Sequence, residues 1–159
     1  MTHDAEPATV TIDPRFCGPP RSGNGGYVCG RVAAALGASG RVRLKAPPPI
    51  GVAMRIEPTA GIAHDADVAA RPTGKRFVDG EVVVAEATAA ELELAVPACP
   101  SLAAAEHARS RYLGFAEHNF PTCFVCGPQR RPGDGLCIFP GALDEGHPSL
   151  LAAPWTPDA

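Results

Sequence analysis

Alternation of apolar and polar residues in the first hundred positions predicts several short β-strands. In a strand, successive side chains point to opposite faces, so strict alternation places one face in a core and the other in water. The predicted strands are residues 8–12, 41–45, 52–57, 77–78 and 81–86, with further alternation at 64–70 and at Leu92, Leu94 and Val96. Asp79-Gly80 lies between two apolar runs and favours a hairpin with a type I′ turn.

Two stretches follow helical spacing instead. From Tyr27 to Leu36, Val28, Val32 and Leu36 recur at four-residue intervals, and Gly37 suits the C-terminal cap. Arg31 is the single charge in this stretch, which predicts a helix buried on most sides. A second helix is predicted from Leu102 to Leu113, with Ser101 as its N-cap and Gly114 at its end.

The element order predicts an α+β fold in which a curved antiparallel β-sheet wraps around a central α-helix. Residues 117–159 differ, because seven prolines interrupt them and leave room for one or two strands and no helix. A segment of this size does not form its own core without a staple or a partner.

Charge and composition exclude several classes of function. The chain of 159 residues has a formal net charge of −3, so it has no overall positive field for nucleic acid or an anionic membrane surface. It holds no apolar stretch near the roughly 20 residues that cross a bilayer. Residues 1–7 lack the basic start and apolar run of a secretory signal, which predicts a cytoplasmic protein. Only Lys45 and Lys75 are lysines among the 14 basic residues, a bias that suggests a GC-rich bacterial genome.

The first candidate site is the loop Ser22-Gly23-Asn24-Gly25-Gly26, which leads into the first predicted helix. Free backbone N–H groups at a helix N-terminus can hold a carbonyl oxygen or a developing oxyanion, and glycines allow close approach. Asn24 is the best polar candidate for orienting water or a carbonyl, although an amide is no general base. The alternative is a loop that only caps the helix. A phosphate-binding loop is disfavoured because no Gly-Lys-Ser/Thr follows.

Two further residues are candidates for chemistry in this part of the chain. Cys29 is predicted about one turn into the helix, where the dipole lowers a thiol pKa and favours a nucleophile; the alternative is a small residue packed on the sheet. Glu86, on the predicted hairpin, is a candidate catalytic carboxylate that faces either solvent or a substrate tunnel.

The six cysteines do not predict a disulfide framework in a cytosolic chain. Cys123-x-x-Cys126 has the spacing of a zinc knuckle, with His118, Cys137 and His147 as further ligands within reach. The same spacing fits a redox pair or a buried turn, and the buried turn, without metal, is the favoured interpretation.

Two segments carry a family resemblance. Residues 16–30, with Gly18-Pro19-Pro20 before Gly25-Gly26-Tyr27, resemble the loop and central helix of the hotdog fold of acyl-CoA thioesterase-like proteins. Residues 123–128 (CFVCGP), followed by Gly135-Leu136, resemble the opening of a further hotdog. The resemblance implies a hotdog domain at 1–97, a linker helix at 98–116 and, at 117–159, the start of a second hotdog.

The resemblance also implies a function. An acyl thioester such as an acyl-CoA would bind with its carbonyl at the helix N-terminus, lined by Ser22, Gly25, Gly26 and Tyr27, with no cofactor besides this substrate. The pantetheine would run between two subunits, so a homodimer is expected. Hotdog thioesterases often carry an acidic residue on the central helix, and residues 27–36 contain none. Two hypotheses therefore stand: a thioesterase, or a catalytically inactive acyl-binding or structural hotdog.

Overall fold

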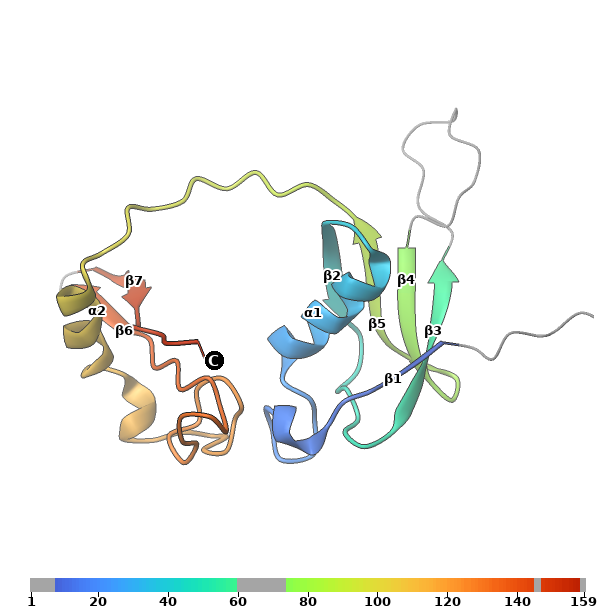
Figure 1. The fold of residues 1–159 in the computed structure, drawn as a ribbon, viewed down its shortest axis with the longest axis horizontal. Helices are drawn as coiled ribbons and strands as arrows, with labels where there is room; N and C mark the ends of the chain where they lie inside the picture. The colour runs from blue at the N-terminus through green and yellow to red at the C-terminus, as the bar shows by residue number, and fades with distance from the viewer. Residues whose placement is uncertain (1–7, 60–73, 145–146, 158–159) are drawn as a thin grey trace, which may run out of the picture. The chain divides into compact units, whose positions relative to one another are not determined.

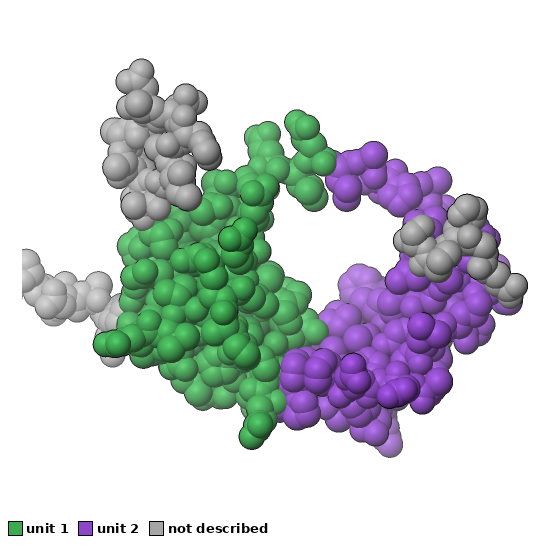
Figure 2. Space-filling model, turned by 180° about the vertical axis from the view of Figure 1, so that it is seen from behind, with its two compact units in different colours: residues 1–14, 21–93 green, residues 15–20, 94–159 purple. Residues whose placement is uncertain are grey.

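The computed structural model describes residues 8–59, 74–144 and 147–157, with the backbone alone at 147–149. The chain divides into two compact units (Figure 2). Unit 1 comprises residues 1–14 and 21–93, and unit 2 comprises residues 15–20 and 94–159. A six-residue segment near the N-terminus therefore packs with the C-terminal part of the chain.

Unit 1 is a five-stranded antiparallel sheet with one helix, α1 (Gly25–Leu36), against it (Figure 1). The strands are β1 (Thr9–Thr11), β2 (Gly40–Leu44), β3 (Ala53–Thr59), β4 (Gly74–Asp79) and β5 (Val82–Ala89). Their order in the sheet is β1-β3-β4-β5-β2, so α1 and the long connections carry the chain from one edge of the sheet to the other. These elements confirm the predicted α+β class.

The strand register defines the sheet face that α1 covers. A side chain at Gly40 would collide with Leu36 of α1, so Gly40 and the residues at even positions after it in β2 face the helix. These positions pair with Ala89, Ala87 and Ala85 of β5, the last two of which are fully buried. The core under α1 also contains Val28, Val32, Met54 and Phe77, all with no exposed surface.

Two details of unit 1 correct the sequence-based predictions. The helix α1 is buried on one side: Val28 and Val32 are inaccessible, while Gly30, Arg31 and Ala34 are exposed. The β4–β5 turn is centred on Gly80-Glu81, and only Gly80 has a positive φ, of 58°. Positive φ at the first central residue alone is the pattern of type II′, so the type I′ prediction is wrong.

The strand expected at Leu92, Leu94 and Val96 does not form. The strand β5 ends at Ala89, and these three side chains are 83%, 67% and 82% exposed. Alternation alone does not form a strand when no neighbouring strand pairs with it. The further strand predicted at residues 64–70 lies outside the described residues.

Unit 2 has less regular structure. Its helix α2 (Leu102–Arg109) begins at the predicted N-cap, where the Ser101 hydroxyl accepts from the Ala104 N–H, but it ends four residues before Leu113. A short 3₁₀ turn, η2 (Leu113–Phe115), follows, and another, η1 (Pro14–Phe16), lies near the N-terminus. The strands β6 (Gly141–Asp144) and β7 (His147–Ala152) form a two-stranded antiparallel sheet. This agrees with the one or two strands expected for residues 117–159.

An aromatic cluster supplies the interior of unit 2. The ring centroids of Tyr112 and Phe139 are 5.5 Å apart, and those of Phe115 and Phe139 are 4.9 Å apart. Phe16 and Phe124 form a second, edge-to-face pair with centroids 4.8 Å apart. Residues 117–159 therefore obtain a core from two partners in the same chain, α2 with the turn after it and the segment 15–20. Among the residues described, no helix is long and apolar enough to span a membrane.

Candidate functional site

The N-terminus of α1 carries four of the residues proposed from the sequence. Asn24 is the N-cap, and its side-chain oxygen accepts the Tyr27 N–H at 3.1 Å. The Asn24 carbonyl accepts the Val28 N–H at 2.9 Å. Gly25 and Gly26 occupy the first two helical positions, whose N–H groups have no acceptor within a helix. The structure thus brings Asn24, Gly25, Gly26 and Tyr27 together at one helix start, whose first amides have no acceptor within the helix.

The loop before the helix is anchored by its backbone. The Gly23 N–H donates to the Pro48 carbonyl at 2.8 Å, and Ser22 forms an isolated β-bridge with Pro49. A Cβ at Gly23 would lie 2.8 Å from Val28 and 3.2 Å from Ile12, so only glycine fits there. Ser22 is 9% exposed, and its backbone bridge to Pro49 fixes the path of the loop.

The side chains of Tyr27 and Arg31, in the first two turns of α1, contact each other. Tyr27 is half-buried, and an Arg31 guanidinium nitrogen donates to its hydroxyl at 3.4 Å. A Cβ at Gly25 would be in ordinary contact, 3.4 Å, with Leu44 of β2. The helix end therefore combines backbone donors, a positive side chain and an apolar neighbour.

Glu86 lies away from this helix end. Its neighbours Ala85 and Ala87 face α1, so Glu86 points to the opposite face of the sheet. There it forms an ion pair with Lys45 at 3.0 Å, with about two fifths of each side chain exposed. The structure gives Glu86 a surface ion pair and does not bring it to the α1 amides.

The structure gives no support to an activated thiol at Cys29. Cys29 is half-buried in α1, and this burial raises the pKa of its thiol, because a thiolate loses solvation there. This direction is opposite to the activation considered from the sequence and favours the alternative, a small residue packed on the sheet.

A second cluster lies in unit 2, at the Cys123-x-x-Cys126 segment. The Gly127 N–H donates to the Cys123 carbonyl at 2.9 Å, which closes a single helix-like turn. The two sulfur atoms are 3.7 Å apart. A Cβ at Gly127 would lie 2.5 Å from the Cys123 nitrogen and the Pro121 oxygen, so the turn requires glycine at this position.

His118 and Tyr112 contact this turn. The Phe120 N–H donates to Nδ1 of His118 at 2.9 Å, and Nε2 lies 3.5 Å from the Cys126 sulfur. The Tyr112 hydroxyl donates to the Cys126 carbonyl at 3.0 Å. Burial, and then Cys126 itself, raise the pKa of Tyr112 above its usual range. Burial is also the largest cause of a raised pKa at Cys126, and the Cys123 thiol adds to it.

A tetrahedral zinc site needs four nitrogen or sulfur ligands, and the structure brings together three of the five considered from the sequence, His118, Cys123 and Cys126. Cys126 contacts both His118 and Cys123, but the Cys137 thiol is directed to the Arg130 carbonyl, 3.8 Å away. The side chain of His147 is outside the description. Across the described residues, no group of three or more His, Cys, Asp or Glu side chains is arranged to hold a metal ion.

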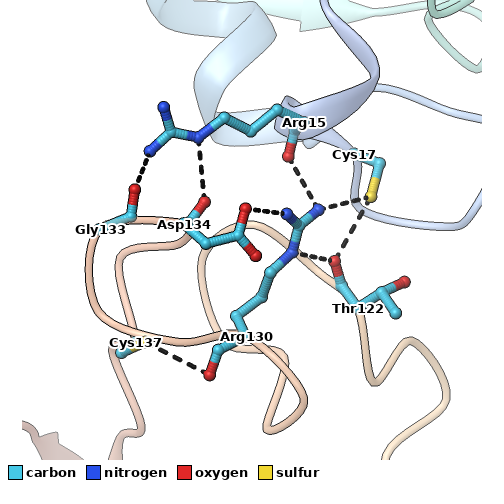
Figure 3. A network of polar contacts seen from close by, with 7 residues as sticks. All are labelled: Arg15, Cys17, Thr122, Arg130, Gly133, Asp134 and Cys137. Carbon is cyan, nitrogen blue, oxygen red and sulfur yellow. Dashed lines mark hydrogen bonds and ion pairs between the residues drawn. The ribbon is translucent and has the colours of Figure 1, made fainter.

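A polar network centred on Arg130 connects the two chain segments of unit 2 (Figure 3). The guanidinium donates to the carbonyls of Thr122 (2.8 Å) and Arg15 (2.9 Å) and pairs with the Asp134 carboxylate at 2.9 Å. It also contacts the Cys17 sulfur at 3.3 Å. Sequence reasoning missed Arg130, because its partners lie up to 115 positions away and no local pattern marks them.

Comparison with known protein families, with curated proteins and with solved structures finds no match to this chain.

Proposed function

We propose that unit 1 is a hotdog-type domain that binds an acyl thioester, with the thioester carbonyl at the N-terminus of α1. The observation that carries the proposal is the pair of amides without a helical acceptor at Gly25 and Gly26, held by the Asn24 cap at one end of a helix that packs on an antiparallel sheet. An acyl carbonyl is a neutral acceptor of suitable size for two adjacent N–H groups, and the helix dipole favours the partial charge on its oxygen.

The surroundings support a ligand of this class. Leu44 beside Gly25 offers apolar contact to an acyl or pantetheine chain. Arg31 carries a positive charge on an exposed turn of the same helix, which favours a ligand with phosphate groups, as coenzyme A has. Asn24 acts here as a positioning residue, because its side-chain oxygen is engaged by the Tyr27 N–H.

Binding without hydrolysis is the function that the residues support best. The helix α1 contains no carboxylate to activate water, and Glu86, the nearest candidate from the sequence, faces the other side of the sheet. In the hydrolytic alternative, water would attack a carbonyl polarised by the same amides, with the base supplied from elsewhere. The exposed side of α1, with Gly30 and Ala34, suits a second copy of the chain, so a homodimer is part of the proposal.

Calorimetric titration with acyl-CoAs of increasing chain length tests the proposal, with free coenzyme A as the matched control. Binding of the acyl forms at least about 10-fold tighter than free coenzyme A would support recognition of the acyl thioester. Equal affinities, or no heat with any chain length, would contradict it. Release of free thiol in the same mixtures separates the two alternatives, because only the hydrolytic one produces it.

A further inference from the structure

The Cys123-x-x-Cys126 turn in unit 2 has no part in acyl-thioester binding, yet it holds two thiols side by side. The sulfur atoms are 3.7 Å apart, and a disulfide requires about 2.0 Å. A change of side-chain rotamer within one turn can close this gap. None of the six cysteines, all of which lie within the described residues, forms a disulfide in this structure.

His118 is arranged to act on one of these thiols. Since its Nδ1 accepts the Phe120 N–H, the proton of the neutral imidazole lies on Nε2, which is 3.5 Å from the Cys126 sulfur. An N–H directed at sulfur stabilises the thiolate, the form that attacks disulfides. The ring is held in place beside Tyr112, whose centroid is 6.1 Å away.

The two cysteines differ in access. Cys123 is 5% exposed, whereas Cys126 is half-buried. An incoming disulfide therefore reaches Cys126 first, and Cys123 lies behind it at a distance suited to a second step. This asymmetry is that of an attacking thiol and a resolving thiol.

We propose that Cys123 and Cys126 form a thiol–disulfide exchange site that takes small disulfides of the glutathione type as its oxidant. Cys126, as thiolate beside the His118 Nε2–H, attacks one sulfur of the disulfide; its proton passes to solvent, a Cys126 mixed disulfide forms and one thiol leaves. Cys123 then attacks the Cys126 sulfur, the mixed disulfide breaks and a second thiol leaves. The two cysteine thiols are thereby oxidised to one disulfide, and the small disulfide is reduced to two thiols.

The surroundings set the pH dependence of the first step. The titratable groups that face the turn are His118, Tyr112 and the two thiols themselves. Because burial and the neighbouring Cys123 raise the pKa of Cys126, little thiolate is present at neutral pH. The rate of oxidation is therefore expected to rise as the pH increases above neutrality.

Peptide mapping of the whole chain tests the proposal directly. Trypsin cleavage after Arg111 and Arg130 releases residues 112–130, which contain Cys123 and Cys126 and none of the other four cysteines. The chain is equilibrated in glutathione buffers of increasing oxidising strength, alkylated and digested. In the most oxidising buffers we expect this peptide to carry no alkyl label. Its mass should be about 2 Da below that of the dithiol peptide, because disulfide formation removes two hydrogens.

Four variants refine the test. Cys123→Ser removes the resolving thiol, so a glutathione adduct at Cys126 should accumulate about 10-fold above the level in the unaltered chain. Cys99→Ser, at an exposed cysteine outside the turn, should behave like the unaltered chain. His118→Phe should move the pH midpoint of Cys126 alkylation upward, and His118→Gln, which retains an N–H donor, should move it less.

The result with the unaltered chain decides the proposal even if a variant fails to fold. A peptide 112–130 that stays fully alkylated in every buffer would overturn it, and so would stable glutathione adducts on both cysteines. Stoichiometric zinc that protects both thiols from oxidation would also overturn it, because the cluster would then be a metal site.

Discussion

Unit 1 and unit 2 are stabilised by different kinds of contact. Unit 1 is a sheet with backbone pairing along five strands and an apolar core under α1, in which Phe77 and Met54 are inaccessible to solvent. Unit 2 has one two-turn helix and a two-stranded sheet, and its chain segments are joined by aromatic rings and by the hydrogen bonds of Arg130. Local sequence pattern determines the first kind of structure, while individual distant contacts determine the second.

This difference can be measured because each unit has its own optical signal. Trp155 is the one tryptophan of the chain and belongs to unit 2. The strands and the longer helix of unit 1 supply most of the far-ultraviolet circular dichroism. Urea unfolding followed by both signals therefore reports on the two units separately.

The largest expected effect comes from the core of unit 1. Phe77→Ala removes a fully buried ring and should lower the free energy of unfolding by about 4 kcal/mol. We expect the dichroism transition to move to lower urea while the Trp155 transition stays in place. Val82→Ala, at a side chain that is 55% exposed, is the control and should change little. Equal movement of both transitions would show that the units unfold as one.

The next effect comes from the polar network of unit 2. Arg130→Lys keeps the charge but loses the planar fork that reaches Thr122, Arg15 and Asp134 at once, and should cost about 2 kcal/mol. Here the Trp155 transition should move and the dichroism transition should remain. The exposed neighbour offers a matched control, Arg131→Lys, for which no change is expected. An unchanged Trp155 transition in Arg130→Lys would contradict a stabilising role of the network in unit 2.

Helix caps give a smaller effect in both units. Asn24→Ala removes the acceptor of the Tyr27 N–H in unit 1, and Ser101→Ala removes the acceptor of the Ala104 N–H in unit 2. Each should cost about 1 kcal/mol, seen in the signal of its own unit. Asn24→Ser, which retains a capping oxygen, should restore most of the stability lost in Asn24→Ala. If it did not, the role of Asn24 would be other than capping.

The smallest effect is a pH dependence on the outer face of the unit 1 sheet. Glu57 accepts hydrogen bonds from Arg76 and Arg55, and these contacts, Arg76 first, lower the pKa of its carboxyl group. A lowered pKa in the folded state stabilises the fold above the ordinary Glu value of 4.5, and that stability is lost as the pH falls through the folded-state pKa. Unfolding of Glu57→Gln, followed by dichroism between neutral and acid pH, should lack this loss. A profile identical to that of the unaltered chain would contradict the contribution of Glu57.

Sequence pattern predicted the sheet of unit 1 well, for a physical reason. Residues 41–45 and 52–57 alternate because one face of each strand meets the core, and both segments are strands within two residues of the predicted bounds. The helix α1 and its cap at Gly37 are encoded locally in the same way. Four of the residues proposed for the site, from Asn24 to Tyr27, could be chosen because they surround a single helix start.

Other features depend on contacts that no local pattern reveals. Leu92, Leu94 and Val96 alternate like a strand, but nothing pairs with them, and they remain exposed. The face on which Glu86 lies depends on the register between β5 and β2. The packing of residues 15–20 against the rest of unit 2 involves Arg130, more than a hundred positions away.

The central claim, that the first amides of α1 hold a thioester carbonyl, is tested most directly by changing one amide without changing the helix. Gly25→Pro removes the N–H at the first helical position, where proline is well tolerated, and the preceding residue already has an extended ψ of 128°. Gly25→Ala retains the N–H and adds a side-chain carbon in ordinary contact with Leu44. We predict that Gly25→Pro weakens acyl-CoA binding by about 3- to 10-fold, the loss of one hydrogen bond, while Gly25→Ala binds within about twofold of the unaltered chain. Equal binding by Gly25→Pro and Gly25→Ala would contradict the claim.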